Sequence, residues 1–499
     1  MIHSEIEQIL ESSEVARKKH DYKKADEILS DGLRQYPDSF ELVVRYGWFL
    51  RNRGRFPEAI HTLKHAQSIA PNHYDVLYNL AIALESDSQM EEALQTYAVL
   101  LEKFPDDSDA QMAFAEANIT YGRPDKALPV IQRLMEVSPE DLCYMVSYGH
   151  LLNETGRYSE AIQIISQVLS KRPEFQDPLL FLAEANYRLF RPVACIEAVN
   201  KAYPLDPDWP LANLWMARVY LQQQKIEEAL QYLFHALEVH PRFFQAHIEI
   251  ARISWQLGNF DQAQRYLEEA VTIAPWNGEV QGMLAKFQVE TKRGKPDLHK
   301  LNELARKLPY SGLPFYLGQI YLMNQDFESA EQLLQLAVES CPENLEYCKL
   351  LGDVYIFRRR LDEAEKEFQF VVNLCPDKMD ALQGLAFVLF QQNKFAEADL
   401  KYSNILVYNP KDPLIYYNYS LVLKELGKKQ ESLAMLNDAR ELSGENGELL
   451  VYIASILIDL GEHIQAQSVL MQAKEKLPDS HPHLIKVMKQ LAKQGEDGL

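Results

Sequence analysis

Several features are scarce in this sequence, and each scarcity excludes a class of protein. The longest uncharged apolar run, Leu449–Ile458, is about half as long as a membrane-spanning helix, so no membrane span is predicted. Basic residues are outnumbered: 51 Lys and Arg stand against 72 Asp and Glu, which gives a net charge of −21. Because that charge repels the phosphates of nucleic acid, we expect no nucleic-acid partner.

Cysteine is also scarce, and its pattern argues against a metal or redox site. The five residues are odd in number and contain no C-x-x-C pair: Cys143, Cys195, Cys341, Cys348 and Cys375. We therefore expect them to be buried as small apolar side chains. The first ten residues, MIHSEIEQIL, lack the basic start and apolar core of a secretory signal, which predicts a cytoplasmic protein.

The sequence contains none of the common catalytic motifs. There is no glycine-rich phosphate loop, no G-x-S-x-G and no H-E-x-x-H. His61 and His65 have the i, i+4 spacing of a metal pair on a helix, but no third ligand is evident. We therefore expect a protein that is not an enzyme and has no cofactor and no metal site.

What the sequence does contain is a regular repeat marked by proline. Nine prolines follow one another at intervals of 34 residues, and the phase continues with four more, with Gly444 in the one gap: prolines 37, 71, 105, 139, 173, 207, 241, 275 and 309, then 342, 376, 410 and 478. Proline cannot continue a helix, so each marks the end of a helical unit. The sequence therefore predicts fourteen units.

Two further positions in each unit hold small residues. When the unit is numbered so that its proline is residue 32, position 8 is Gly, Ala or Ser in all fourteen units, for example Gly47, Ala81 and Gly149, and position 20 is Ala in eleven of them. Position 24 is large, as in Leu63 or Tyr97. Small residues at these spacings allow two helices to approach closely.

This combination of small residues, alanine, a large apolar residue and proline at a period of 34 resembles the tetratricopeptide repeat. The resemblance covers about residues 6–480, and the motif G-x2-Y appears in full at Gly318–Tyr321 and Gly352–Tyr355. It implies an all-α fold: a right-handed α-solenoid superhelix of stacked helix-turn-helix hairpins, in which each hairpin contacts mainly its neighbours.

The pattern is interrupted once. In the ninth unit Asp297 replaces the alanine of position 20, the turn carries Lys292–Pro296, and the following unit is one residue short. We expect altered packing there and a bend between an N-terminal block of eight units (1–275), a deviant ninth unit (276–309) and a C-terminal block of five (310–478). The alternative is a drifted repeat with unchanged geometry.

The segment 479–499 is predicted to be a capping helix with a tail. Leu484, Val487, Met488 and Leu491 fall on one helical face and lysines fall on the other. A solenoid needs a polar outer surface at its ends, and such a helix would cover the apolar side of the last unit.

The resemblance also implies where a partner binds. In tetratricopeptide repeats, positions 2, 5, 6, 9, 12 and 13 of the first helix face the concave groove. Two sets of residues at such positions stand out. The first strip comprises Phe181, Arg188, Leu214, Trp215, Arg218, Ile248, Arg252 and Trp255, and the second strip comprises Phe315, Tyr316, Phe357, Phe387, Phe390 and Tyr417.

The first strip combines aromatic residues with arginine, the residue types that most often anchor protein interfaces. The second strip is more apolar and would suit an amphipathic or hydrophobic segment. In both strips the alternative is that the aromatic side chains pack between neighbouring helices.

The main functional hypothesis is a non-catalytic adaptor or scaffold that binds one or more proteins or peptide segments in its concave groove. Two alternatives remain open: a regulatory receptor for a peptide or metabolite, and an accessory subunit of a glycosyl-transfer, secretion or envelope-assembly machine.

Overall fold

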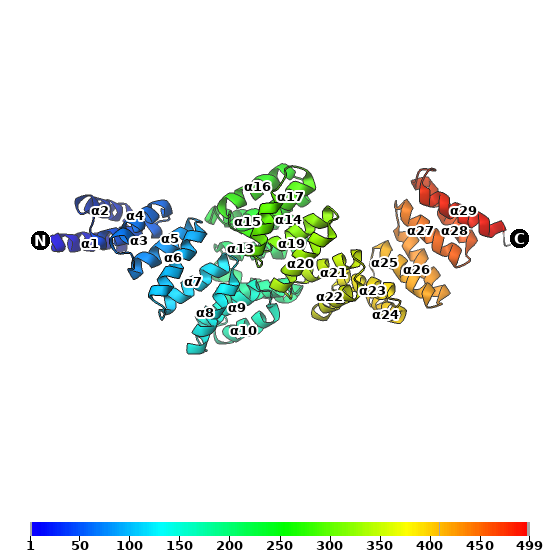
Figure 1. Ribbon diagram of the computed structural model, residues 1–499, viewed down its shortest axis with the longest axis horizontal. Helices are drawn as coiled ribbons and strands as arrows, with labels where there is room; N and C mark the ends of the chain where they lie inside the picture. Colours follow the sequence, from blue (N-terminus) through cyan, green and yellow to red (C-terminus); the bar gives the residue numbers. More distant parts are fainter. Residues whose placement is uncertain (1, 409, 497–499) are drawn as a thin grey trace. The chain divides into compact units, whose positions relative to one another are not determined.

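The computed structural model describes residues 2–408 and 410–496, so the end of the predicted tail, 497–499, lies outside it. Within the described residues the chain forms 29 α-helices and one short 3-10 helix, η1 (Tyr203–Leu205), and no strand (Figure 1). The prediction of an all-α fold is confirmed. The helices alternate as the first and second members of fourteen hairpins, followed by one extra helix.

The odd-numbered helices are the first members of the hairpins: α1 (Ile2–Lys18), α3 (Phe40–Asn52), α5 (Tyr74–Ser86), α7 (Ser108–Thr120), α9 (Leu142–Glu154), α11 (Gln176–Arg188), α13 (Pro210–Gln222), α15 (Phe244–Gln256), α17 (Gly278–Thr291), α19 (Leu313–Met323), α21 (Leu345–Phe357), α23 (Met379–Gln391), α25 (Pro413–Glu425) and α27 (Gly447–Asp459). The even-numbered helices are the second members: α2 (Tyr22–Gln35), α4 (Phe56–Ile69), α6 (Met90–Lys103), α8 (Pro124–Val137), α10 (Tyr158–Lys171), α12 (Pro192–Ala202), α14 (Ile226–Val239), α16 (Phe260–Ile273), α18 (Leu298–Lys307), α20 (Phe327–Ser340), α22 (Leu361–Leu374), α24 (Phe395–Leu406), α26 (Lys429–Leu442) and α28 (His463–Lys476).

The small residue at position 8 is where the two helices of a hairpin cross most closely. A Cβ atom added to Gly47 would stand 2.6 Å from Cγ of Leu63, the position-24 residue of the same hairpin. Gly318 and Leu334 repeat this arrangement, with 2.7 Å between the corresponding atoms. Leu63 and Leu334 are fully buried, and burial of a leucine side chain stabilises the fold by about 2 kcal/mol.

One residue of the turn between the two helices adopts the left-handed conformation in every repeat. Position 15 has a positive φ, between 53° and 79°, in all fourteen repeats, but only six of these residues are glycine. A left-handed residue after the last helical turn satisfies the free carbonyl groups of the helix end. At a bulky residue such as Phe190 this conformation costs about 1–2 kcal/mol, so the packing of the two helices imposes it.

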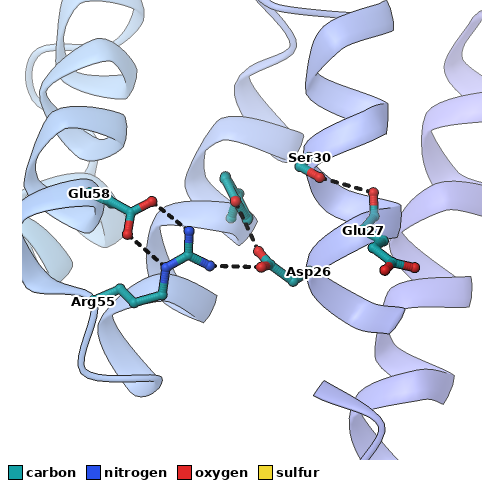
Figure 2. Close-up of polar contacts among 6 residues, drawn as sticks. Asp26, Glu27, Ser30, Arg55 and Glu58 are labelled. Atoms are coloured by element: carbon teal, nitrogen blue, oxygen red, sulfur yellow. Dashed lines mark hydrogen bonds and ion pairs between the residues drawn. The ribbon is translucent and has the colours of Figure 1, made fainter. Parts of the chain in front are cut away.

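An acidic residue on the second helix links some successive hairpins, as Figure 2 shows for the first and second. Asp26 accepts hydrogen bonds from the Tyr46 hydroxyl (2.9 Å) and from Arg55 (2.7 Å), both in the next repeat, and Arg55 also pairs with Glu58. Between the twelfth and thirteenth repeats, Asp399 accepts from Tyr419 (2.8 Å) and Lys428 (2.8 Å) in the same way. Burial of the hydroxyl and the bond to Asp26 raise the pKa of Tyr46 to about 12.

The chain divides into two compact units, residues 1–344 and 345–499. The N-terminal unit holds α1–α20, and the C-terminal unit holds α21–α29. In the C-terminal unit, α29 (Pro482–Glu496) packs against α27 and α28 through Leu484 and Val487, which are 1% and 4% exposed. This is the predicted capping helix, although Met488 is 43% exposed and lies outside its buried face.

The ninth repeat departs from the hairpin geometry of the others. Here α17 packs mainly against α19, the first helix of the next repeat, and has little contact with its own second helix, α18. At ten residues α18 is also the shortest α-helix of the chain within the described residues, and Asp297 caps its N-terminus by accepting from the Lys300 amide (3.1 Å). A carboxylate at position 20 cannot fill the small-residue site of a normal hairpin, so α18 is displaced.

In the N-terminal unit, repeats far apart in the sequence contact each other. Leu308 joins the core of the third and fourth repeats, and the ring of Trp276 lies 5.8 Å from that of Tyr121. Further along, the Glu343 amide donates to the Gly156 carbonyl (3.1 Å), and a carboxylate oxygen of Glu343 accepts from the Ser159 amide (2.7 Å). One turn of the solenoid thus closes upon the next.

Membrane-spanning helices and metal sites would both bear on function. In 2–408 and 410–496 no helix is long and apolar enough to cross a membrane, and no group of three or more His, Cys, Asp or Glu side chains is arranged to hold a metal ion. Four cysteines are buried, as predicted for all five, but Cys143 is exposed because it lies in the first turn of α9.

Candidate functional site

The first helices of the hairpins lie on the inner side of the curved array. Successive first helices touch one another, for example α9 with α11 and α11 with α13, in addition to their contacts with the second helices between them. Elements that approach each other across an intervening helix must lie where the curve is tightest. The inner face of the N-terminal unit is therefore built by side chains that point away from the second helices.

Position 9 of the first helix is charged or ionisable in six consecutive repeats of the N-terminal unit. The series runs in steps of 34 residues: Glu116, His150, Glu184, Arg218, Arg252 and Lys286. The first three are acidic or histidine, and the last three are cations. All but Glu116, which is exposed, are half-buried. We call this set the position-9 series.

In the cationic half of the series, one buried carboxylate joins two arginines. Glu249 is 1% exposed and accepts from Arg218 (2.8 Å) and from Arg252 (2.9 Å), while Arg252 also lies 3.8 Å from Glu279. Burial raises the pKa of Glu249, but Arg252 and Arg218 outweigh it and hold the pKa below its usual value. Glu249 therefore stays ionised, and the arginine–glutamate triad of Arg218, Glu249 and Arg252 keeps one net positive charge.

Two cations of the position-9 series, Arg218 and Lys286, also contact aromatic rings. The Arg218 guanidinium lies 4.6 Å from the ring centroid of Trp215 and 5.8 Å from that of Tyr187. Lys286 lies 5.6 Å from the ring of Trp255. Stacking on a ring fixes the orientation of a guanidinium and adds a favourable electrostatic contact. The cationic half is thus held in place before any partner binds.

The acidic half of the series is less completely neutralised. His150 stacks on Phe181 at 4.4 Å, with an interplanar angle of 4°, and lies 3.7 Å from Glu154. Burial lowers the pKa of His150, but the bond to Glu154 raises it above its usual value overall. Glu184 lies 3.6 Å from Arg188.

The surroundings of Glu184 disfavour its negative charge. Burial and the nearby Glu154 raise its pKa, and Arg188, His150 and Arg218 oppose this only in part. A raised pKa means that the negative charge of Glu184 is disfavoured in the free protein. A cation brought to this place by a partner would remove that cost.

The structure divides the first strip into two groups. Leu214, Trp215 and Ile248 are only 2%, 2% and 4% exposed, because their side chains pack between neighbouring helices, and they form part of the core. Phe181, Arg188, Arg218, Arg252 and Trp255 are half-buried on the inner face. The surface that a partner can touch therefore excludes the first group.

The second strip is shared between the two compact units. Phe315 and Tyr316 belong to the N-terminal unit, where Tyr316 packs on Gly282. The other four lie in the C-terminal unit: Phe357, which is 62% exposed, and the half-buried Phe387, Phe390 and Tyr417. Phe390 contacts the ring of Phe395 at 5.8 Å, and Tyr417 contacts that of Tyr452 at 6.3 Å. These six residues do not form one site within either unit.

Sequence reasoning missed His150, Glu184, Glu249 and Lys286. Its signal was aromatic and arginine content, which selected Arg218 and Arg252 at position 9 but passed over the carboxylates, the histidine and the lysine. A comparison of position 9 across consecutive repeats would have found the series, because charge at one phase of six successive repeats is not required by hairpin packing.

Comparisons with known proteins agree with this architecture. Family models described as tetratricopeptide repeat match residues 50–117 and 215–277, and no curated protein matches the sequence. The crystal structure of the APC/C hetero-tetramer Cut9–Hcn1 resembles the chain with a TM-score of 0.63 at 12% identity, over 97% of this chain and 96% of that one.

Two further solved structures align with lower scores. A tetratricopeptide repeat protein from Parabacteroides merdae aligns at 20% identity over 47% of this chain and 93% of its own, with a TM-score of 0.44. Yeast Tom70 aligns at 15% identity over 89% and 96%, with a TM-score of 0.38. The repeat matches, the likeness to Cut9–Hcn1 and the fourteen hairpins agree on one fold. The chain thus contains tetratricopeptide repeats and folds as an all-helical repeat solenoid.

Proposed function

We propose that this protein is a non-catalytic scaffold that binds an extended segment of a partner protein along the inner face of its N-terminal unit. Proteins built from this repeat are protein-interaction scaffolds and are typically non-catalytic. The proposed contact surface is the position-9 series together with Phe181, Arg188 and Trp255. The partner segment would carry a cation where it meets Glu184 and an anion where it meets Lys286.

The observation that carries the proposal is that the charges of this face are half-buried and incompletely compensated. Burial and Arg252 lower the pKa of Lys286, opposed only by Glu290, just as the pKa of Glu184 is raised. Because burial disfavours the charged form of each group, ionised Glu184 and ionised Lys286 both lower the stability of the fold. Groups of this kind become favourable when a partner supplies the opposite charge.

The test uses substitutions that remove these charges without disturbing the fold. In the variant Glu184→Gln, Lys286→Gln, two unfavourable charges are lost, so its thermal stability should equal or exceed that of the parent protein. The matched control is Arg265→Gln, Glu269→Gln on α16, which removes an ion pair of 3.9 Å on an exposed surface. Both variants leave the net charge unchanged.

Each protein serves as bait for quantitative affinity purification from cells of its source. We expect partners captured by the parent protein and by the control to be depleted about tenfold with the inner-face variant, since each charge contact contributes up to about 1 kcal/mol. Equal capture by all three baits would refute the assignment of the inner face.

A further inference from the structure

A cleft lies between the two turns of the solenoid that meet in the N-terminal unit. It has a volume of about 680 Å³ and is bounded on one side by the start of α6 and by Tyr121, and on the other by Trp276, α17 and α18. This volume falls within the range of about 300–1,000 Å³ typical of ligand sites. The cleft is separate from the position-9 series, whose residues do not line it.

The cleft exists because of the deviant ninth repeat. In other repeats the second helix covers its own first helix, but α18 is displaced, and Leu284 and Gln288 of α17 line the cleft instead. The turn before α18 is longer than in the other repeats, because α17 ends at Thr291 and α18 begins only at Leu298. The irregular sequence of the ninth repeat thus produces a specific concave surface.

The floor of the cleft is apolar and aromatic. It is formed by Met90, Tyr121 and Trp276 together with Leu301 and Leu304. Tyr121 and Met90 are 9% and 3% exposed and belong to the core of the third and fourth repeats, so the floor is rigidly supported. A floor of this composition favours one large apolar side chain.

The rim of the cleft is predominantly acidic. Its charged residues are Glu91, Glu92 and Asp297 against Lys300. Glu92 is neutralised by Lys64 at 2.6 Å, whereas Glu91 and Asp297 are exposed carboxylates on opposite sides of the opening. Carboxylates at the two edges of an apolar cleft favour positive charge on either side of an apolar anchor.

We propose that this inter-turn cleft is a second binding site, for a peptide segment in which one large apolar side chain is flanked by lysine or arginine. The occupant contacts both turns of the solenoid at once. Binding therefore stabilises the contact between the turns by linkage, because the peptide has no such site when the turns are apart.

The probe is the fluorescein-labelled peptide Gly-Arg-Phe-Arg-Gly, measured by fluorescence anisotropy at physiological salt with the full-length protein. Gly-Arg-Ser-Arg-Gly and Gly-Glu-Phe-Glu-Gly serve as comparison peptides, the first without the apolar anchor and the second with reversed charge. We expect saturable binding of the first peptide and at least tenfold weaker binding of the other two.

The rim variant is Glu91→Gln, Asp297→Asn, in which asparagine preserves the N-cap of α18. Its matched control is Glu227→Gln, Asp326→Asn. Glu227 has the same place at the start of α14 as Glu91 at the start of α6, and Asp326 caps α20 by accepting from the Ser329 amide (3.1 Å). Both variants change the net charge equally.

We expect the rim variant to bind the probe about tenfold more weakly than the parent protein, because each removed charge should weaken binding by up to about fivefold. The control should bind the probe as tightly as the parent protein does. Hydrogen exchange should slow on peptide binding in segments 88–92 and 297–304. The proposal is overturned by absence of saturable binding up to about 1 mM, by equal weakening in both variants, or by protection confined to other segments. Because neither rim residue lies on the inner face, these results are independent of partner capture there.

Discussion

The contact between successive turns of the N-terminal unit can be tested by adding a single methyl group. A Cβ atom added to Gly156 would stand 2.5 Å from Cα and 2.8 Å from the carbonyl carbon of Cys341. These are backbone atoms, so they cannot move away by a change of rotamer as the end of a side chain could. We expect Gly156→Ala to force apart the segments that carry Gly156 and Cys341.

The turn glycine of the eighth repeat provides a matched control. Gly258 occupies the same turn position with φ +78°, against +62° for Gly156, and a Cβ atom there would meet nothing within 4 Å. Gly258→Ala therefore reports the cost of an alanine in the left-handed region alone, about 1 kcal/mol. Gly156→Ala adds an overpacking cost of about 1–3 kcal/mol. The difference between the variants isolates the contact between the turns, at about 2 kcal/mol.

Hydrogen exchange can measure this difference at two amides. The Glu343 amide bonds to the Gly156 carbonyl, and the Ser159 amide bonds to the Glu343 carboxylate. A loss of about 2 kcal/mol corresponds to about thirtyfold faster exchange where local opening controls the rate. We expect this acceleration in Gly156→Ala and not in Gly258→Ala. Unchanged exchange at both amides in Gly156→Ala, or equal acceleration in the two variants, would refute the reasoning.

Four further substitutions test the packing and the charges. Glu249→Ala removes the carboxylate that Arg218 and Arg252 share and should lower the free energy of unfolding by about 3 kcal/mol. This is the lower end for a buried pair, because Arg252 is 35% exposed and keeps Glu279 at 3.8 Å. The pKa of Glu249 is lower in the folded protein than in the unfolded chain. The difference in free energy of unfolding between the parent protein and this variant should therefore be full above pH ~4.3 and disappear as the pH falls through the folded pKa. Urea unfolding at a series of pH values would measure it. Asp26→Ala should cost about 1–2 kcal/mol in urea unfolding, because it removes both bonds from the next repeat, whereas Glu58→Ala should cost less than about 0.5 kcal/mol. Leu267→Ala, at a fully buried site, should cost about 2–5 kcal/mol by the same measurement, and a loss below about 1 kcal/mol would contradict the packing described.

The hairpins could be predicted from the sequence because their determinants are local and repeated. Position 8 of a regular repeat faces position 24 of the same hairpin. Gly47 and Leu63, for example, are paired although they are only 16 positions apart in the sequence. The left-handed turn was signalled only where it is glycine, as at Gly54. At Phe190 the same geometry is set by packing, which no residue preference reveals.

The candidate site was predictable only in part. The groove positions inferred from the family treated Trp215 and Trp255 alike, but Trp215 lies between first helices and is buried, whereas Trp255 lies further along its helix and is half-exposed. The contact of Trp276 with Tyr121 has no sequence signal, since the two residues are 155 positions apart and belong to repeats that do not follow each other. It depends on the accumulated curvature of the repeats between them.

Closure of one turn upon the next changes how the N-terminal unit is expected to unfold. An open repeat array is cooperative only between nearest neighbours, so it frays from its ends and its stability is a sum of local terms. Hydrogen bonds that join residues 184 and 187 positions apart couple the fifth repeat directly to the tenth. The repeats between them are then bounded on both sides, as in a ring, and should melt together as one block while the first two repeats still fray independently.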